Sequence, residues 1–453
     1  MGKYFGTDGF RGEANVTLSA LLAYKVGRFV GWYCAEKKRD FGERGRVVIG
    51  KDTRRSSYML EYALAAGIAA SGADAYMLHV ITTPGVSYVT RVDGFDYGIM
   101  ITASHNQYTD NGIKVLGAGG EKLDDALTAL IEEYLDGDED SLPLATGVEI
   151  GRIVDYTSGR NRYIGYLISL ATHSYKGMRI GIDAANGAAF DIAESVFSAL
   201  GAETHLIGRE PDGTNINSGC GSTHIDALVS LVKESALDLG IAFDGDADRC
   251  IAVDGQGEIV DGDRIIYVLA RSMKRRDMLN RDTVALTVMS NSGFIGSLAA
   301  LGIKADITAV GDRYVWERMQ SEGYSLGGEQ SGHVIIRKYA TTGDGILTAI
   351  MLCEEICESK TTLARLTKDV LIYPQITVNV RVTDKDAVMS DSEVLAELHR
   401  TEAEIGRCGR VLLRKSGTEN VIRIMIEYED KSACYRFAER IKEVILKRGY
   451  GEK

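Results

Sequence analysis

The sequence predicts an α/β protein with a smaller α+β domain at its C-terminus. Three times an apolar, β-branched run is followed by a Gly/Asn/Asp/Ser loop and then by a helical pattern, in residues 46–72, 178–201 and 283–302. Each repeat has the size of a βα unit, and the recurrence of such units predicts sheets covered by helices. The loops that follow the strands are then expected at one edge of each sheet, where folds of this kind bind ligands.

The tail after Pro374 follows another pattern. The stretch "ITVNVRV" alternates with a period of two, a polar helix is expected near Ser392–Thr401, and "RVLLRKSG", "NVIRIMIEYE" and a final helix follow. Strands that neighbour in sequence, with helices after them, predict a small α+β domain. Turn-rich segments near residues 145, 255 and 373 are the candidate domain boundaries.

Composition excludes several classes of protein. The 453 residues are 45% hydrophobic and 26% charged, as in an ordinary globular protein, and the net charge of -12 argues against non-specific nucleic-acid binding. No run approaches the roughly 20 apolar residues of a membrane span, so no membrane partner is expected. Seven scattered cysteines without a C-x-x-C pair are typical of reduced thiols in a cytoplasm.

Residues 101–114, "ITASHNQYTDNGIK", place Ser104 beside His105 directly after an apolar run. A hydrolytic serine, a turn-forming cluster and a serine that carries phosphate are the three interpretations. The G-x-S-x-G elbow is absent, and sequence neighbours on an extended chain face opposite sides, which makes a Ser–His triad awkward. The segment therefore favours a phosphate carrier, with Lys114 or His105 handling the proton of an acceptor hydroxyl.

The stretch "IAFDGDADRC" places Asp244, Asp246 and Asp248 at alternate positions after another apolar run. Three converging carboxylates repel one another, so a hard cation, Mg²⁺ first, is their natural partner. An EF-hand is excluded, because Arg249 and Gly255 stand where its Gly and Glu would be required. A solvated acidic turn is the remaining alternative.

The stretch "SLGGEQSGHVI" carries Glu329, Ser331 and His333 at alternate positions. On an extended chain these would present an acceptor, a hydroxyl and an imidazole on one side, as a reader of sugar hydroxyl or amino groups. A tight hairpin with incidental polar residues explains the same pattern equally well.

The stretch "RKSGTENVIR" contains Arg414, Ser416, Gly417, Thr418 and, on the next strand, Arg423. Two guanidinium groups, two hydroxyls and a glycine turn make a phosphate cradle, with a solvated arginine turn as the alternative. The order differs from that of a nucleotide P-loop.

Two further basic segments carry weaker signals. Arg11 ends the glycine-punctuated turn "YFGTDGFRG" and has the charge to meet a phosphate. The basic segment "KDTRRSS" is similar, and solvated charges that open a helix are the alternative interpretation of Arg54 and Arg55.

Taken in order, these segments resemble the α-D-phosphohexomutase superfamily. The resemblance rests on "YFGTDGFRG", "ITASHN", "DNGIK", "FDGDADR", "GGEQSGH" and "RKSGTE", and it spans essentially the whole chain. The segments "GEQSGH", "EPDGTNINSGCGSTH" and "MSNSG" resemble the subfamily that acts on glucosamine phosphates.

The resemblance implies four domains around a central cleft. Three are related α/β domains with mixed sheets: residues 1–155 with the phosphoserine loop, 156–253 with the metal loop, and 254–370 with the sugar-binding loop. The fourth, residues 371–453, is the smaller α+β domain with the phosphate-binding loop.

The resemblance also implies a role for each site residue. Ser104 resembles the phosphoserine, with Lys114 as the likelier general base and His105 and Arg11 in the catalytic neighbourhood. Together with the Ser104 phosphate, three side chains resemble the ligands of one Mg²⁺ ion: Asp244, Asp246 and Asp248. The residues that resemble the substrate-binding set are Arg249, Glu329, Ser331, His333, Arg414, Ser416, Gly417, Thr418 and Arg423.

The implied reaction interconverts glucosamine 6-phosphate and glucosamine 1-phosphate through glucosamine 1,6-bisphosphate, which also serves as activator. It lies on the route to UDP-N-acetylglucosamine, a peptidoglycan precursor, in the cytoplasm, and a homodimer is left open. The alternatives are a phosphomannomutase or phosphoglucomutase with the same mechanism, a sugar phosphatase, and a non-catalytic sugar-phosphate sensor. Gln107, Lys415 and Asn420 stand where the family often has proline, which predicts more mobile loops.

Overall fold

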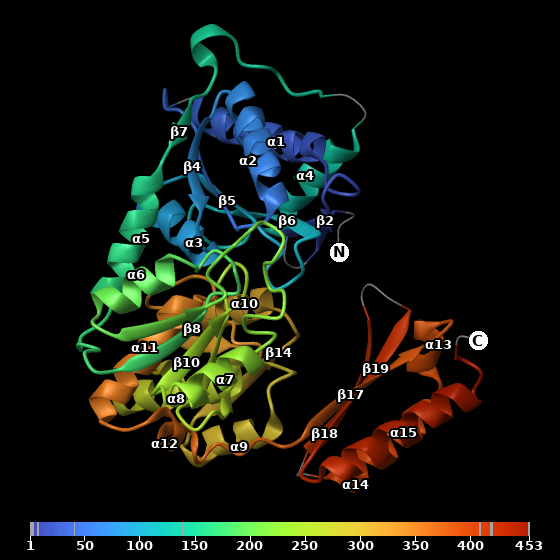
Figure 1. The fold of residues 1–453 in the computed structure, drawn as a ribbon. Coiled ribbons are helices and arrows are strands. Elements are labelled where there is room, and N and C mark those ends of the chain that lie inside the picture. The colour runs from blue at the N-terminus through green and yellow to red at the C-terminus, as the bar shows by residue number, and fades with distance from the viewer. Residues whose placement is uncertain are drawn as a thin grey trace. The chain divides into compact units, whose positions relative to one another are not determined.

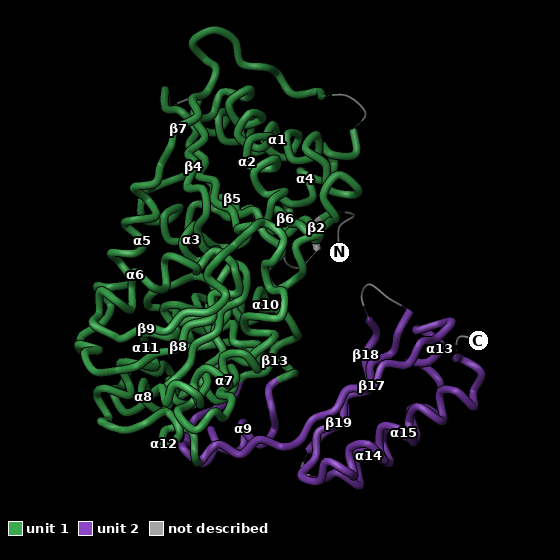
Figure 2. Tube along the Cα trace, in the orientation of Figure 1, with its two compact units in different colours: residues 1–289, 306–368 green, residues 290–305, 369–453 purple. Residues whose placement is uncertain are grey.

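The computed structural model describes residues 4–6, 9–39, 41–137, 140–406, 409–416 and 420–451. The chain divides into two compact units (Figure 2). Unit 1 comprises residues 1–289 and 306–368, and unit 2 comprises residues 290–305 and 369–453. Figure 1 labels the helices and strands of both units.

The first sheet of unit 1 has seven strands in the order β1-β2-β6-β5-β3-β4-β7. Helices α1, α2 and α4 lie on one side of this sheet, and α3 on the other, next to α5 (Figure 1). The elements are β1 (Phe5–Gly6), β2 (Gly9–Glu13), α1 (Ala20–Arg39), β3 (Arg46–Lys51), α2 (Arg55–Ala70), β4 (Asp74–Val80), α3 (Thr83–Val92), β5 (Tyr97–Ile101), β6 (Asp110–Leu116), α4 (Asp125–Asp136), the 3₁₀-helix η1 (Gly147–Glu149), β7 (Ile153–Asp155) and α5 (Thr157–Ser169).

The central strands of this sheet are buried on both faces. Val47, Val48 and Ile49 of β3 are fully buried, which explains why the strand reads as one continuous apolar run. Strands β3, β4 and β5 are parallel. Their C-terminal ends therefore meet at one edge of the sheet, and the loops that follow them lie together there.

The second sheet has five strands in the order β12-β11-β10-β8-β9. Its elements are β8 (Arg179–Asp183), α6 (Ile192–Ala199), β9 (Glu203–Ile207), α7 (Asp226–Glu234), β10 (Leu239–Phe243), β11 (Cys250–Asp254) and β12 (Ile259–Val260). Strand β10 is parallel to β8 and antiparallel to β11, so the chain makes a tight turn over residues 244–249 between two buried strands.

The third sheet has four strands in the order β14-β13-β15-β16. Strands β15 and β16 form an antiparallel hairpin. The elements of this region are α8 (Gly262–Arg275), the 3₁₀-helix η2 (Asn280–Asp282), β13 (Thr283–Thr287), α9 (Ser292–Ala300), β14 (Lys304–Thr308), α10 (Asp312–Glu322), β15 (Leu326–Gly328), β16 (Val334–Ile336), α11 (Gly345–Ser359) and α12 (Leu363–Thr367). Of these, α9 belongs to unit 2.

Unit 2 contains an antiparallel sheet in the order β17-β19-β18. Apolar side chains from the strands and from α14 and α15 form a separate core. The fully buried Glu427 accepts hydrogen bonds from Ser292 and pairs with Arg410, which joins residues 290–305 to this sheet. The elements are β17 (Gln375–Arg381), α13 (Lys385–Ser390), α14 (Ser392–Ile405), β18 (Gly409–Lys415), β19 (Val421–Tyr428) and α15 (Lys431–Lys447).

The predicted α/β class with a C-terminal α+β part is confirmed. The three predicted βα repeats are β3–α2, β8–α6 and β13–α9, and the tail forms the expected strands and helices. The predicted domain limits at residues 155, 253 and 370 stay a prediction. Among the described residues, none of the helices is long and apolar enough to cross a bilayer.

Candidate active site

Ser104 lies in a strained loop just after β5. Its φ of 51° falls in the left-handed region, which costs a non-glycine residue free energy and therefore needs support from its surroundings. The residue is only 1% exposed, and its amide donates to Thr102 Oγ1 at 3.0 Å. Its hydroxyl donates to Asp244 Oδ2 at 2.6 Å, across a sequence separation of 140 residues. Ser104 therefore lies beside Asp244 of the predicted metal-binding segment. Hydrogen bonds from its backbone amide and from its hydroxyl fix its orientation.

The three predicted aspartates converge. Asp244, Asp246 and Asp248 follow β10, are buried, and each presents an oxygen within 4.8 Å of the others. Burial and the charges of Asp248 and Asp246 raise the pKa of Asp244 well above its usual range. A negative charge on Asp244 is therefore disfavoured, and a bound cation would relieve it.

The donor set fits a hard divalent cation. The ligands are carboxylate oxygens, which suit Mg²⁺ rather than a softer metal. Asp246 Oδ1 is buried and accepts no hydrogen bond from the described residues. Buried oxygens usually have a partner, so this one is available as a cation ligand. These observations support a cation at the triad.

Lys114 approaches the triad from β6. Its ammonium lies 3.0 Å from Asp246 Oδ2 and 3.5 Å from Asp248 Oδ2, and the side chain is 3% exposed. Burial opposes ionisation of Asp248, but the charges of Lys114 and His333 outweigh it and hold the pKa of Asp248 well below its usual range. Thr83, at the start of α3, donates its hydroxyl to Asp246 Oδ2 at 2.5 Å.

His105 is unsuited to a serine–histidine triad in this structure. Burial and the positive charges of Arg249 and Arg11 lower the pKa of His105 to about 4, so the ring is neutral at physiological pH. Its Nδ1 is buried with no hydrogen-bond partner among the described residues. The Ser104 hydroxyl donates to Asp244 instead, which agrees with the sequence argument against a hydrolytic serine.

Arg249 flanks the triad. Its Nε lies 3.9 Å from Asp244 Oδ2 and 3.8 Å from Asp248 Oδ1. Burial opposes its charge, but the carboxylates of Asp244 and Asp248 outweigh it and raise the pKa of Arg249. The guanidinium is therefore a permanent positive charge beside the triad, placed to attract an anionic substrate.

The glycine-rich segment that starts at residue 325 forms a tight hairpin, the second of its two predicted structures. Residues 329–332 turn between β15 and β16, with the Gly332 amide donating to the Glu329 carbonyl at 3.0 Å and Gly332 at a φ of 91°. The extended-chain argument for Glu329, Ser331 and His333 is therefore wrong in its geometry. Glycine at this φ makes the turn possible, since other residues adopt it rarely.

The hairpin nevertheless places its polar residues near the metal loop. His333 Nδ1 lies 3.6 Å from Asp248 Oδ2, and its Nε2 lies 3.6 Å from Asp312 Oδ2. Burial opposes protonation of the imidazole, but Asp248 and Asp312 outweigh it and raise the pKa of His333 to about 9. Glu329 Oε1 accepts from the Gly311 amide at 3.2 Å, and Ser331 Oγ is buried without a partner among the described residues.

The predicted phosphate cradle lies in unit 2. Arg414 on β18 and Arg423 on β19 are directly opposite each other. Burial and the like charge of Arg423 lower the pKa of Arg414, so an anion that contacts both would relieve their repulsion. Ser416 is buried, and its carbonyl accepts from Lys385 at 2.9 Å. Gly417 and Thr418 lie outside the described residues.

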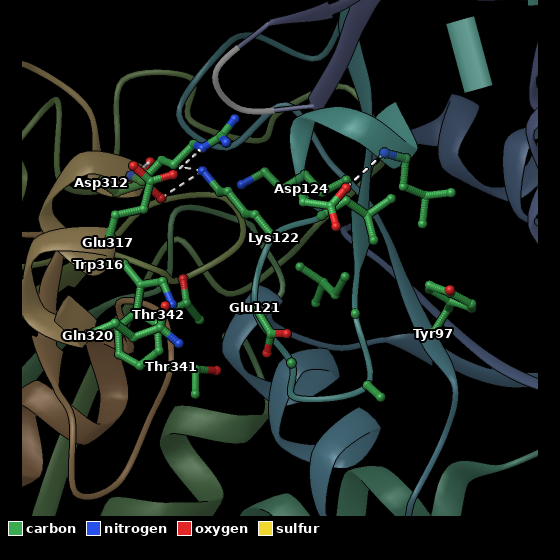
Figure 3. A pocket seen from close by; sticks show the side chains of 18 of the residues that line it. Tyr97, Glu121, Lys122, Asp124, Asp312, Trp316, Glu317, Gln320, Thr341 and Thr342 are labelled. Carbon is green, nitrogen blue, oxygen red and sulfur yellow. Dashed lines mark hydrogen bonds and ion pairs between the residues drawn. The ribbon is translucent and has the colours of Figure 1, made fainter. Parts of the chain in front are cut away.

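A cavity of about 520 Å³ adjoins the triad within unit 1 (Figure 3). It reaches Lys114 and Asp248, and Lys122 crosses it to form an ion pair with Asp312 at 2.7 Å. Figure 3 shows Trp316, Gln320, Thr341 and Thr342 on one side and Glu121, Asp124 and Tyr97 on the other. Among the described residues, Ser104, Asp244 and Glu329 do not line this cavity. It is therefore a side chamber of the site, with access to Lys114 and Asp248.

Several neighbours of the site were missed by the sequence analysis. Thr83 had a weak signal, since "TTPG" only indicates a helix start, and Asp312 lay in a segment without a motif. The solvated-charge interpretation of Arg54 is wrong, because the side chain is fully buried and contacts the Ser104 loop. Asn217 contacts the same loop and lies in "EPDGTNINSGCGSTH", whose residues carry no pattern that points to the Ser104 loop.

Comparison with known proteins identifies the family. Models of the phosphoglucomutase/phosphomannomutase family match its α/β/α domain I at residues 2–141, domain II at 161–257, domain III at 261–372 and the C-terminal domain at 378–444. The chain belongs to the phosphoglucomutase/phosphomannomutase family. Its members are phosphohexomutases, which are isomerases that transfer a phosphoryl group within a sugar phosphate.

Curated relatives within the phosphoglucomutase/phosphomannomutase family match the whole chain. The phosphoglucosamine mutase of Lachnospira eligens is 54% identical over 450 residues, covering 99% of this chain and 100% of the relative. The phosphoglucosamine mutase of Bacillus subtilis is 48% identical over 445 residues, covering 98% of each.

Solved structures share the family fold at lower identity. A phosphoglucomutase/phosphomannomutase family protein from Burkholderia thailandensis superposes with a TM-score of 0.81 at 23% identity, covering 100% of this chain and 99% of that one. N-acetylphosphoglucosamine mutase from Aspergillus fumigatus gives a TM-score of 0.67 at 16% identity, covering 99% and 96%. At these identities the likeness concerns the fold alone.

Proposed function

We propose that this chain is a phosphoglucosamine mutase that interconverts glucosamine 6-phosphate and glucosamine 1-phosphate. The observation that carries the chemistry is the hydrogen bond from Ser104 Oγ to Asp244 Oδ2, inside a buried triad of carboxylates. A cation beside a hydroxyl that carries phosphate would neutralise charge during transfer, and the Ser104 hydroxyl lies at the group of carboxylates that could hold one. The full-length relatives named phosphoglucosamine mutase support the amino-sugar substrate.

The reaction begins with phosphate already on Ser104. The O1 hydroxyl of glucosamine 6-phosphate attacks this phosphorus, the P–Oγ bond breaks, and a P–O1 bond forms to give glucosamine 1,6-bisphosphate. The O1 proton passes to Lys114, whose amine is the proposed base. After the bisphosphate turns end for end, its 6-phosphoryl group moves to Ser104 Oγ and O6 regains the proton. Glucosamine 1-phosphate leaves, and the enzyme is phosphorylated as before.

Asp244, Asp246 and Asp248, with the Ser104 phosphate, would hold one Mg²⁺. When bound, the ion supplies charge neutralisation for the transferring phosphoryl group. The Aspergillus fumigatus enzyme was solved in complex with GlcNAc-6P and magnesium, which supports the same choice here. Lys114, the proposed base, lies in the same cluster, with its nitrogen 3.0 Å from Asp246 Oδ2 and 3.5 Å from Asp248 Oδ2.

The remaining side chains of the proposed site bind the substrate. Arg249, with Arg11 near His105, supplies positive charge for the substrate at the triad. Glu329, Ser331 and His333 are proposed to read the sugar from the hairpin. In unit 2, the proposed grip on the non-reacting phosphate consists of Arg414, Ser416, Gly417, Thr418 and Arg423.

Parallel coupled assays test the substrate. The expected result is a higher kcat/KM for glucosamine 6-phosphate than for glucose 6-phosphate or mannose 6-phosphate. A higher kcat/KM for glucose 6-phosphate or mannose 6-phosphate would show instead that the chain is a phosphoglucomutase or a phosphomannomutase. Release of inorganic phosphate without an isomeric sugar phosphate would indicate a phosphatase.

Intact-mass spectrometry tests the mechanism. After incubation with glucosamine 1,6-bisphosphate, wild-type protein should carry one phosphoryl group and Ser104→Ala none. A Ser104→Ala protein that still interconverts the isomers would overturn the proposal. A sensor without catalysis would bind the sugar phosphates and convert none.

The proposal extends to a cytoplasmic location, and a homodimer stays open. The six cysteines that the structure describes are free thiols, which suits a reducing compartment. Light scattering coupled to size-exclusion chromatography would test the dimer, and a mass of one chain would refute it.

A further inference from the structure

Two side chains from distant parts of unit 1 hold the backbone of the Ser104 loop, residues 102–106. Arg54 Nη2 donates to the Ser104 carbonyl at 3.3 Å and to the Asn106 carbonyl at 2.7 Å. Asn217 Nδ2 donates to the same two carbonyls, both at 2.9 Å. Each carbonyl therefore accepts from both donors.

Both donors are themselves fixed. Arg54 is fully buried at the start of α2 and pairs with Asp52, whose Oδ1 accepts from the Arg54 amide at 3.0 Å. Asn217 is 4% exposed, and its backbone amide donates to the Ala185 carbonyl at 2.9 Å. A buried charge with a carboxylate partner is expensive to maintain for solubility or for folding alone. Arg54 Nη2 donates both of its hydrogen bonds to carbonyls of one loop.

The metal loop touches the same point. A Cβ at Gly245, between Asp244 and Asp246, would lie 2.6 Å from the Ser104 carbonyl oxygen and 2.8 Å from Asn217 Nδ2. Only glycine permits this approach without a shift of backbone. The Ser104 carbonyl thus accepts hydrogen bonds from Arg54, which precedes α2, and from Asn217 in the region of the second sheet. Gly245, also in that region, packs closely against the same oxygen.

These contacts decide where the hydroxyl points. Ser104 has a φ of 51°, which its own sequence does not favour. If its carbonyl rotated away from the two donors, the side chain would rotate with the backbone and Oγ would leave Asp244. A displacement of about 1 Å at a reacting atom can lower a rate by roughly 10²-fold.

We propose that Arg54 and Asn217 are positioning residues that hold Ser104 in its transfer geometry. This inference rests on the proposed mutase function. Neither residue touches the reacting atoms. Their effect therefore belongs in kcat and in the rate of Ser104 phosphorylation, not in substrate affinity.

Asn217→Asp is the most direct test, because it keeps the shape and replaces the donor with an acceptor that repels both carbonyls. We expect kcat to fall by about 10²-fold with KM within about threefold of wild type. Ser104 phosphorylation by glucosamine 1,6-bisphosphate, followed by intact mass, should slow in parallel. Asn217→Ala removes the donor without adding charge and should lower both rates less, by about tenfold.

Asn215→Asp is the matched control. It introduces the same charge two residues away in the same loop, where Asn215 Nδ2 donates to the Glu210 carbonyl and not to the Ser104 loop. Its kcat and phosphorylation rate should stay within about threefold of wild type. If it lost activity as Asn217→Asp does, added charge and not positioning would be the cause, and the inference would fail.

The outcomes separate this inference from the proposed function. If wild-type protein itself acquires no phosphate on Ser104, the mutase proposal fails whatever the variants do. If wild type is phosphorylated and a folded Asn217→Asp is phosphorylated at the same rate, only the positioning role is overturned. Should Asn217→Asp fail to fold, Asn217→Ala is judged by the same criterion, and an unchanged rate in it refutes the role.

Discussion

Replacing Asp246 with Asn would separate the charge of one triad carboxylate from its shape. Asp246 is fully buried, and its Oδ2 accepts hydrogen bonds from Thr83 at 2.5 Å and Lys114 at 3.0 Å. The amide oxygen of Asn can take over these bonds. Its NH₂ group then occupies the position of Oδ1, the oxygen that accepts no hydrogen bond from described residues, and presents hydrogens where a cation requires lone pairs.

The size of the effect follows from the number of charges lost. One of three formal negative charges disappears, and the remaining amide is oriented against the cation. Metal stabilisation of a transferring phosphoryl group is worth several kcal/mol, and about 4 kcal/mol corresponds to a fall in kcat of about 10³-fold. The dissociation constant for Mg²⁺ should rise at least about tenfold as well.

Three measurements distinguish this from misfolding. The coupled mutase assay gives kcat at a magnesium concentration that saturates wild type, and calorimetric titration gives the affinity for Mg²⁺. Thermal unfolding should show that Mg²⁺ stabilises wild type, by about 2.7 kcal/mol at a hundredfold excess over Kd, and stabilises Asp246→Asn far less. Without metal the variant should still unfold cooperatively, because the Asn oxygen can keep the hydrogen bonds from Thr83 and Lys114.

Asp226→Asn provides the control. Asp226 is exposed in the first turn of α7 and lies outside the triad, so the same substitution there should leave kcat and Mg²⁺ affinity unchanged. If Asp246→Asn retained kcat within tenfold of wild type while still folded, the triad would not be the catalytic metal site. The assignment of the chemistry to Ser104 would then lose its cation.

Three further substitutions test other parts of the structure. Arg423→Ala should raise KM about tenfold with little change in kcat, because it removes one guanidinium of the pair with Arg414; a fall in kcat alone would contradict a ground-state grip. Asp344 is buried, which raises its pKa to about 6, so its contribution to stability is present below about pH 4 and is lost as pH rises through about 6. Asp344→Asn stays neutral, and its unfolding free energy relative to wild type should therefore increase by roughly 1–3 kcal/mol from about pH 4 to about pH 7; a difference independent of pH would refute this. Glu427→Ala leaves Arg410 without its buried carboxylate and should destabilise unit 2 by roughly 3 kcal/mol in denaturant unfolding, and an unchanged midpoint would show that this ion pair contributes little.

The sequence predicts most of the architecture because the β3–α2, β8–α6 and β13–α9 units are local patterns. Each combines a run of buried β-branched residues with a turn and a helical period, and these are set by nearby residues. Ser104 and Asp244 were also predictable, since each follows a buried strand with a cluster of polar residues that a core would not tolerate. Their meeting was not predictable from the residues alone, because 140 residues separate them.

The residues that the sequence analysis missed share a physical reason. Arg54 has the sequence context of a solvated helix start, and only tertiary packing shows that it is fully buried. Asn217 and Thr83 each carry a common polar side chain whose partner lies more than 100 residues away. For Ser331 and His333, strand alternation suggested an extended chain, but the φ of 91° at Gly332 makes a turn. Glycine allows this conformation without requiring it, so the pattern could not decide.

The carboxylate triad and the Arg414–Arg423 pair have one electrostatic feature in common: in each, neighbouring like charges shift a pKa against the charged form. In unit 1 the charges of Asp248 and Asp246, with burial, raise the pKa of Asp244, and in unit 2 burial and Arg423 lower the pKa of Arg414. Asp244 and Arg414 thus each sit where their own charge is disfavoured, and a ligand of opposite sign would relieve it, a cation in one case and a phosphate in the other. Such repulsion lowers the stability of the ligand-free protein, and it is retained only where binding needs it. The Arg414–Arg423 pair suits a phosphate from either end of a sugar, because it recognises charge at a fixed spacing and not the shape of the ring, as a reaction with a turning bisphosphate requires.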